Sequence, residues 1–188
     1  MVVATKNPDK AAEVRAVLRR VFPEMEQVEG LDWEDVAETG ATLEENAVLK
    51  AKAVAAATGL AAIADDTGLE VAALGGAPGV RTARYAGPGA TYAANRHALL
   101  AAMAGVSDRR ARFRTVVALV WGREVVIAAG EVSGTIATAE RGSGGFGYDP
   151  VFTVDGRTLA EHGVDAKNLF SHRARALEAL AVLLRTGP

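Results

Sequence analysis

The chain has 188 residues, with 21 Lys and Arg against 23 Asp and Glu, so its formal net charge is −2. A chain of this length can bury a core without disulfides, and we expect one domain over residues 1–188. The charge balance argues against stable nucleic-acid binding, which needs a basic excess. With no Cys and only 3 His, the chain excludes thiol catalysis and Cys-ligated zinc and favours an oxygen-ligated metal such as Mg²⁺.

The sequence shows no targeting or membrane signal. No charged leader precedes an apolar stretch in Met1–Lys6. No apolar run approaches the roughly 20 residues of a membrane span. Together with the absence of Cys, this predicts a cytoplasmic protein without membrane contact.

The N-terminal segment predicts a strand followed by a helix. The apolar run 2–5 is typical of a short buried strand. Asn7 is expected to cap a helix that has Pro8 in its first position. Five apolar residues at helical spacing predict the buried face of this helix: Ala11, Val14, Val17, Leu18 and Val21.

A second helix and a second strand follow. Thr42-Leu43-Glu44-Glu45 predicts a capping box at the beginning of a helix, and Gly59 predicts its end. Residues 60–64 then predict a strand, which we expect to stop where the polar residues Asp65-Asp66-Thr67 begin.

The remainder of the chain predicts further strands between two helices. A helix over 92–103 and a final helix capped by Ser171 enclose this region. Gly122-Arg123 predicts a two-residue hairpin. The expected strands cover 113–121, 124–132, 135–138 and 151–154, the last turning at Asp155-Gly156. The alternation predicts an α/β fold with a mixed sheet flanked by helices.

Two helix beginnings carry cations where acids are preferred. Lys10 lies in the first turn after Thr5-Lys6-Asn7-Pro8-Asp9, and His172 and Arg173 follow Ser171, with Lys167 just before. A bound anion would explain both, since helix beginnings attract phosphate. The alternatives are an ordinary capped helix whose Lys10 points to solvent, and an Arg173 that extends to solvent while His172 packs.

Two further segments carry acids, glycines and aromatic rings. Asp65-Asp66, with Glu38 as a third oxygen ligand, suits Mg²⁺ beside substrate phosphates, although either Asp could simply cap a turn. Gly144, Gly145 and Gly147 allow close approach of a flat ligand. Phe146 and Tyr148 offer ring faces to it, and Asp149 offers an acceptor. The alternative is a glycine-rich turn with one buried ring.

These residues together resemble the inosine/xanthosine triphosphate pyrophosphatase family, whose members hydrolyse non-standard purine nucleoside triphosphates. The resemblance covers nearly the whole chain in family order. Its motifs are Thr5–Lys10, Glu38–Ala47, Ala64–Leu69, Pro78–Val80, Ala83–Gly87, Gly144–Pro150, Lys167-Asn168 and Ser171–Ala174. Arg81-Thr82 departs from the Tyr-Ser pair that is frequent in the family.

The resemblance implies a homodimer whose elongated mixed sheet lines a substrate cleft between two lobes. It implies that Glu38 and Asp66 hold Mg²⁺, that Asp66 is the catalytic base, and that Lys50 assists on the phosphate side. The residues implied to bind substrate are Thr5, Lys6, Asn7, Pro8, Asp9, Lys10, Thr67, Phe146, Gly147, Tyr148, Asp149, Lys167, His172 and Arg173.

The expected reaction is Mg²⁺-dependent hydrolysis of ITP, dITP and XTP to the monophosphate and pyrophosphate. Two alternatives remain at this point. One is a nucleotide pyrophosphatase for other modified bases. The other is a purine-nucleotide or RNA binding module without catalysis.

Overall fold

The computed structural model describes residues 1–186. Its backbone forms two compact units. The first contains Met1–Asp66, Thr115–Glu131 and the chain from Ser171 onward, and the second contains Thr67–Arg114 and Val132–Phe170. The expectation of a single domain, and of a cleft between lobes, stays a prediction.

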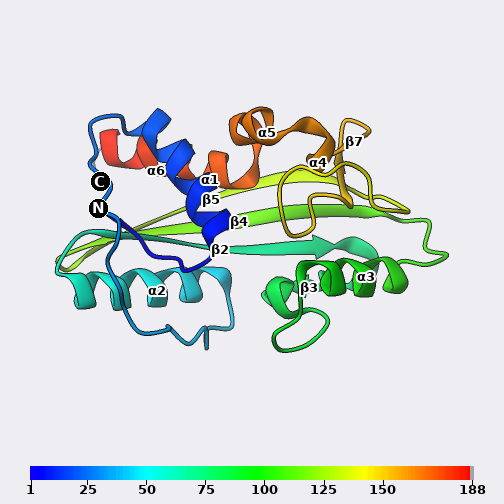
Figure 1. Cartoon of the computed structure of the whole chain (residues 1–188), viewed down its shortest axis with the longest axis horizontal. Coiled ribbons are helices and arrows are strands. Elements are labelled where there is room, and N and C mark those ends of the chain that lie inside the picture. Colours follow the sequence, from blue (N-terminus) through cyan, green and yellow to red (C-terminus); the bar gives the residue numbers. More distant parts are fainter. Residues whose placement is uncertain (187–188) are drawn as a thin grey trace. The chain divides into compact units, whose positions relative to one another are not determined.

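A mixed sheet runs through the fold, as the sequence predicts (Figure 1). Its strands are β1 (Val2–Val3), β2 (Ala62–Val71), β3 (Pro78–Gly79), β4 (Arg110–Trp121), β5 (Glu124–Ile136), β6 (Phe152–Val154) and β7 (Arg157–Thr158). Their order is β1-β2-β4-β5-β6-β7, with β3 paired to β2. The pairing of β1 with β2 is parallel, whereas β5, β6 and β7 pair antiparallel.

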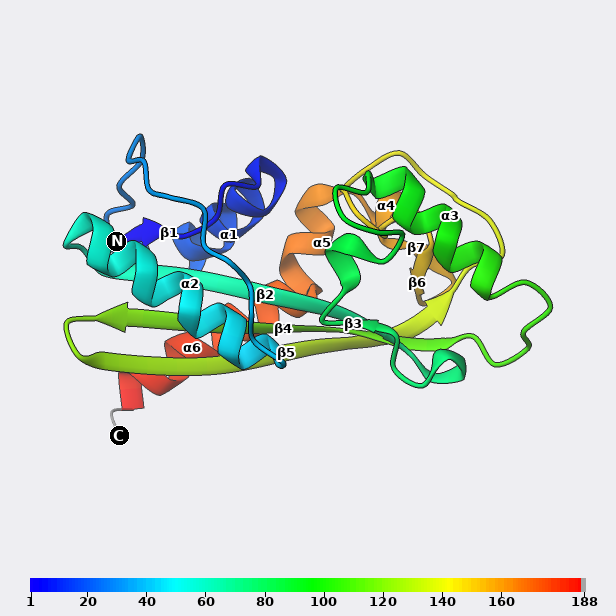
Figure 2. The same cartoon turned by 90° about the horizontal axis from the view of Figure 1, so that it is seen from below.

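In the first unit, helices cover both faces of the strands. Helices α1 (Pro8–Val21) and α6 (His172–Thr186) lie on one face, and α2 (Leu43–Thr58) lies on the opposite face, which Figure 2 turns toward the viewer. The predicted apolar face of α1 is confirmed, because all five of its residues are buried. Val14, Val17 and Leu18 share one hydrophobic cluster with residues of β1, β2, β4, β5 and α6.

The predicted helix ends are largely confirmed. Asn7 caps α1 by accepting from the backbone N–H groups of Asp9 and Lys10. Thr42 caps α2, and Gly59 ends it at φ 69°. The capping box is only half correct, because the Glu45 carboxylate accepts from the N–H of Ala41 (2.6 Å) rather than from the N–H of Thr42.

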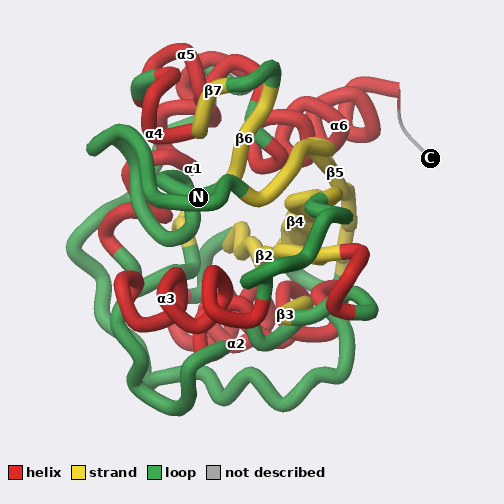
Figure 3. Tube along the Cα trace, turned by 90° about the vertical axis from the view of Figure 1, so that its right-hand side faces the viewer, coloured by secondary structure: helices red, strands yellow, loops and turns green. Residues whose placement is uncertain are grey.

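In the second unit, α3 (Tyr92–Ala102) lies on one side of the strands, and α4 (Leu159–His162) and α5 (Val164–Phe170) lie on the other, as Figures 1 and 3 both show. Two short 3₁₀ helices, η1 (Ala72–Leu74) and η2 (Thr82–Arg84), precede α3. The sequence reasoning missed α4 and α5. A core cluster joins these elements through Leu69, Leu99, Phe113, Tyr148, Phe152 and Leu159.

Two strand predictions are wrong in the same way. The strand expected to stop at Asp65 continues to Val71, so Asp65 and Asp66 lie inside β2. The segment expected as a separate strand over 135–138 is the end of β5, which runs unbroken from Glu124 to Ile136. Asp65 and Asp66 can lie inside a strand because cations from other elements, Lys10, Lys50 and Arg173, pair with them. Within residues 1–186, no helix combines the length and the apolar character that crossing a membrane requires.

Candidate active site

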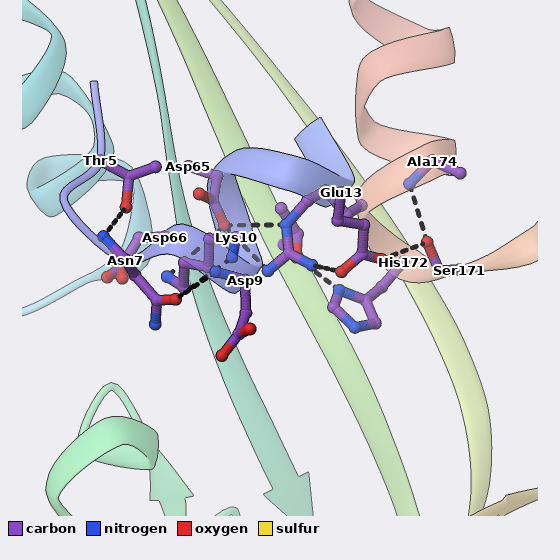
Figure 4. A network of polar contacts seen from close by, with 12 residues as sticks. Thr5, Asn7, Asp9, Lys10, Glu13, Asp65, Asp66, Ser171, His172 and Ala174 are labelled. Atoms are coloured by element: carbon purple, nitrogen blue, oxygen red, sulfur yellow. Dashed lines mark hydrogen bonds and ion pairs between the residues drawn. The ribbon is translucent and has the colours of Figure 1, made fainter. Parts of the chain in front are cut away.

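A buried network of charges lies in the first unit, where α1, β2 and α6 meet (Figure 4). The Arg173 guanidinium donates to Glu13 Oε2 at 2.5 Å and, through Nε and Nη2, to Asp65 Oδ2 at 3.2 and 3.1 Å. Lys10 Nζ lies 3.6 Å from the same Asp65 oxygen. The Ser171 hydroxyl donates to Glu13 Oε1 at 3.2 Å. Arg173, Glu13 and Asp65 are each at most 5% exposed.

This network changes the interpretation of the two helix beginnings. The sequence suggested that a bound anion compensates Lys10 and Arg173. In the structure, the protein's own carboxylates, Asp65 and Glu13, already do so. The expectation that Arg173 lies open to a ligand is therefore wrong, because its side chain is 2% exposed and its guanidinium is held by two acids.

The network separates the behaviour of the two adjacent aspartates. Burial alone raises the pKa of Asp65, but Lys10, Arg173 and Lys50 together bring it well below its ordinary value. Burial also raises the pKa of Asp66, and there the opposing effects of Lys50 and Lys10 do not cancel it, so that pKa stays above its ordinary value. Asp65 is thus the more strongly ionised member, whereas Asp66 holds its proton more readily.

The depressed pKa of Asp65 predicts a loss of stability in acid. A carboxyl whose pKa is lowered by folding adds stability that is fully present above its ordinary pKa of 3.8 and is lost as the pH falls below that value. Urea unfolding of the wild type and of Asp65→Asn, measured from about pH 7 to about pH 2.5, should show a steeper acid decline in the wild type. Parallel declines in the two proteins would contradict the assignment, and the exposed-site variant Asp155→Asn should retain the wild-type slope.

A second polar cluster lies beside the first and contains the predicted metal ligands. Lys50 Nζ donates to Glu38 Oε1 at 2.7 Å and to Asp66 Oδ1 at 3.3 Å. The Asn46 side-chain amide donates to Asp66 Oδ2 at 3.2 Å. Glu38 and Asp66 are thus brought to one cation, the Lys50 ammonium, and their role as metal ligands stays a prediction.

The chemistry of these two carboxylates fits a magnesium ion that shares its ligands with a substrate. One positive group, the Lys50 ammonium, already lies within 3.3 Å of an oxygen of each acid. Within residues 1–186 no group of three or more His, Asp or Glu side chains is arranged to hold a metal. Mg²⁺ typically takes one or two carboxylates and completes its shell with phosphate oxygens and water. The pair therefore suits Mg²⁺ only with a phosphate ligand present.

The Thr5–Lys10 segment forms the turn that leads from β1 into α1. Asn7 uses its side-chain oxygen to accept from the backbone N–H groups of Asp9 and Lys10, at 3.0 and 3.2 Å, and Pro8 has none. The Thr5 hydroxyl accepts from the N–H of Asn7. The exposed Lys6 pairs with Asp35 at 2.9 Å. The sequence analysis expected this helix beginning to attract a phosphate, but the backbone N–H groups of Asp9 and Lys10 are already paired within the segment.

His172 opens α6 and is buried rather than exposed. Its ring Nδ1 lies 2.6 Å from the hydroxyl of Thr115 on β4, and His172 is 3% exposed. Ser171 caps the helix by accepting from the N–H of Ala174. The predicted cap is thus confirmed. Lys167, which the sequence grouped with His172 and Arg173, belongs to the second unit.

In the second unit, three of the predicted base-binding residues contact one another. Lys167 Nζ lies 2.6 Å from Asp149 Oδ2 and 4.7 Å from the centre of the Phe146 ring. The Phe146 N–H donates to the same Asp149 oxygen at 2.9 Å. Gly145 adopts φ 70°, and a side chain there would meet the Asp149 carboxylate at 2.0 Å. The glycines of this motif therefore allow the loop to fold closely around Asp149.

Tyr148 behaves differently from its neighbours. Its ring is 4% exposed within the core of the second unit, and its hydroxyl donates to the Thr82 carbonyl at 2.9 Å. Burial raises the pKa of this hydroxyl. The expectation that Tyr148 offers a ring face for stacking is therefore wrong, because the ring packs in the core. Thr67 follows Asp66 on β2 and is half-buried.

The sequence reasoning missed three residues of these clusters: Glu13, Asn46 and Thr115. Glu13 carried a signal, since an acid four residues before Val17 lies beside the apolar face of α1 and needs a buried cation. Asn46 and Thr115 carried none, because polar residues inside a helix or a strand are ordinary.

Comparison with known proteins agrees with the fold. Residues 1–183 match the Ham1 family. A dITP/XTP pyrophosphatase of Symbiobacterium thermophilum is 50% identical, covering 100% of this chain and 98% of the relative. One of Syntrophobacter fumaroxidans is 50% identical over 94% of this chain and 78% of its own.

Solved structures of similar proteins have the same fold. The Staphylococcus aureus Ham1 protein superposes with a TM-score of 0.86 at 39% identity, covering 98% of this chain and 97% of that one. A Mycobacterium abscessus structure described as a nucleoside-triphosphatase and dITP/XTP pyrophosphatase gives 0.73 at 43% identity, covering 95% and 97%. Sequence and structure together show that the chain belongs to the Ham1 family.

Proposed function

We propose that this protein hydrolyses non-standard purine nucleoside triphosphates, namely dITP, ITP and XTP or dXTP, to the monophosphate and pyrophosphate. The observation that carries the proposal is Asp66, a 6% exposed carboxylate with a raised pKa beside Glu38 and Lys50. Relatives about 50% identical to the chain are named dITP/XTP pyrophosphatases. The activity would remove unwanted nucleotides from the pool.

In this proposal the first unit takes the triphosphate. Lys6 and Lys10 offer ammonium groups on either side of the α1 beginning, where the helix adds partial positive charge. Thr5, Asn7, Pro8 and Asp9 shape the turn that presents them. Because the first-turn N–H groups are already paired, charge rather than backbone donation supplies most of the attraction.

Glu38 and Asp66 would hold Mg²⁺, which supplies neutralisation of phosphate charge when it is bound. The Lys50 ammonium would then move toward the phosphates or remain beside the carboxylates. Its pKa is raised, because Asp66, Asp65 and Glu38 together outweigh the effect of burial, so it remains charged in either position.

The chemical step that we propose is attack of water on the α-phosphorus. The water oxygen forms the new P–O bond, the bond to the pyrophosphate oxygen breaks, and Asp66 accepts the water proton. A raised pKa makes Asp66 a better proton acceptor than an ordinary aspartate, provided that it starts ionised. Asn46 holds the other carboxylate oxygen in place.

The second unit takes the purine in this proposal. Phe146 offers a ring face, Asp149 an acceptor for ring N–H groups, and Lys167 a donor toward a keto oxygen. We propose that His172, held by Thr115, also contacts the substrate. Gly147 and Tyr148 contribute through their backbone, and Arg173 acts only through Glu13 and Asp65. We further propose that the protein is a cytoplasmic homodimer, as the family resemblance implies.

The test is pyrophosphate release from dITP, XTP, dATP and dGTP with Mg²⁺ and with the metal removed by EDTA. We expect turnover of dITP and XTP, loss of turnover with EDTA, and rejection of dATP by roughly 10⁴–10⁵-fold, because a 6-amino group cannot accept from buried donors. Tight dITP binding without turnover would instead support a binding module. Preferred turnover of modified pyrimidines would support the other alternative.

A further inference from the structure

The loop that carries Phe146 and Asp149 has little regular structure of its own. Gly145 and Gly147 adopt φ angles of 70° and 60°, so the backbone between them is sharply turned. A flexible loop makes a poor recognition surface unless neighbouring elements fix it. Residues of the second unit outside the loop hold it in place.

Helix α3 contacts the loop through two residues one turn apart. The Tyr92 ring lies 5.9 Å from the Phe146 ring at an interplanar angle of 42°. Four residues later, Arg96 Nη1 donates to the Gly147 carbonyl at 2.9 Å. Residues spaced by four lie on the same face of a helix. One face of α3 therefore contacts two consecutive loop residues, Phe146 and Gly147.

Arg96 is itself held in a defined orientation. Its Nε lies 3.0 Å from Glu140 Oε1, and its side chain is only 16% exposed. The contact with Glu140 is an ion pair without a hydrogen bond, whereas the bond to the Gly147 carbonyl is directional. An ammonium lacks the planar fork that reaches both groups at once. The pair therefore connects α3, the segment before the loop and the loop itself.

The helix is anchored independently of the loop. The Asn95 amide accepts from the Ala86 N–H at 2.8 Å and donates to the Ala83 carbonyl at 2.9 Å. Leu99 is fully buried in the core of the second unit. The position of helix α3 is thus fixed by the core of the second unit. Its contacts with Phe146 and Gly147 restrict the movement of the loop.

We infer that Arg96 and Tyr92 are positioning residues for purine recognition, which act through Gly147 and through the Phe146 ring. The inference rests on the proposed function, in which Phe146 and Asp149 contact the base. Arg96 fixes the Gly147 carbonyl, and so the spacing between the Phe146 ring and the Asp149 carboxylate. Tyr92 limits the tilt of the Phe146 ring. Both residues affect binding of the base, through the loop, and not binding of the phosphates.

The test compares Arg96→Met, which removes the hydrogen bond to Gly147 and the ion pair with Glu140, with Arg96→Lys and with Glu140→Gln, which keeps the guanidinium. Steady-state kinetics with dITP should give Arg96→Met a KM raised about 10- to 100-fold, with kcat nearly unchanged, from loss of a charge-assisted hydrogen bond. Arg96→Lys and Glu140→Gln should fall between it and the wild type. Tyr92→Ala should raise KM about 3-fold, from loss of an aromatic pair.

Two further measurements separate positioning from a general structural role. Inhibition by inorganic tripolyphosphate, which has no base, should be unchanged in Arg96→Met. Hydrogen exchange of the amides over 144–149 should be faster in that variant. The matched control is Arg110→Met, because Arg110 is an exposed arginine of the same unit that pairs with Asp108 alone among its carboxylate neighbours in the described chain. It should leave KM, inhibition and exchange at wild-type values.

A wild-type KM in Arg96→Met, in an enzyme that turns over dITP, would overturn the inference and leave the proposed function intact. Equal losses for dITP and tripolyphosphate would also overturn it, since they would indicate a general disruption. If the wild type turns over no nucleotide, the proposed function fails. The exchange measurement then decides the inference, and unchanged exchange over 144–149 in Arg96→Met overturns it.

Discussion

Replacing Asp66 with Asn should lower pyrophosphate release from dITP by about 10²–10⁴-fold, the range that general-base catalysis contributes. The amide keeps the shape of the side chain and an acceptor oxygen, but it cannot accept the proton of the attacking water. It also removes one of the two carboxylates proposed for Mg²⁺. The measurement is the rate of pyrophosphate release at saturating Mg²⁺.

Folding should not explain the loss in Asp66→Asn. Because burial raises the pKa of Asp66, the folded protein penalises its charged form, and a neutral side chain relieves that penalty. Urea unfolding should therefore give this variant a stability close to or above that of the wild type. The matched control is Asp155→Asn in the exposed turn between β6 and β7, where Asn also tolerates the φ of 50°. Wild-type activity in Asp66→Asn would remove Asp66 from the chemical step.

The elements that depend on local chemistry were predictable from the sequence. Asn7 with Pro8, Thr42 and Gly59 begin or end helices through contacts within a few residues, and each lies where the sequence predicted. The hairpin at Gly122-Arg123 joins β4 and β5 in the same way. The partners that form such caps and turns lie within a few residues of one another. They can therefore be predicted without knowledge of the tertiary fold.

The errors at Asp65 and Arg173 concern charges whose partners are distant in sequence. Asp65 interrupts a strand in the sequence pattern, but its partner Arg173 comes from a position 108 residues later, and the strand continues. Arg173 looked misplaced at a helix beginning for the same reason. Pairing across such separations depends on the tertiary fold, so local propensity could not predict it.

The sequence predicted which residues lie together in the candidate site better than it predicted which groups they contact. Glu38 with Asp66, and Phe146 with Asp149 and Lys167, are each brought together. The cations that bind these acids and the residues that orient them, such as Lys50 and Asn46, depend on which helix covers which strand. Residue types indicated the ligand chemistry, whereas only the structure shows which groups are already satisfied within the protein.

Replacing Arg173 with Met should destabilise the protein by about 3–5 kcal/mol, because it leaves buried acids without their cation. Glu13 would lose its ion pair with Arg173, and Asp65 would retain Lys10 at 3.6 Å. The free energy of unfolding of natural domains is only about 5–15 kcal/mol, so this loss should lower the urea midpoint strongly. The neighbouring variant Arg175→Met, at an exposed position of α6 that binds the Glu131 carbonyl, should change stability far less.

The same variant decides between the two roles considered for Arg173. If the guanidinium mainly holds Glu13 and Asp65, Arg173→Met loses stability, and the double variant Arg173→Met with Glu13→Gln recovers part of it, because it removes a buried charge that has lost its guanidinium partner. If the guanidinium instead serves the purine, Arg173→Met keeps its urea midpoint and loses only affinity for dITP. The 2% exposure of Arg173 and its bonds to two carboxylates favour the first outcome. In that outcome Arg173 stabilises the fold of the unit proposed to bind phosphate. The purine must then be recognised by other groups.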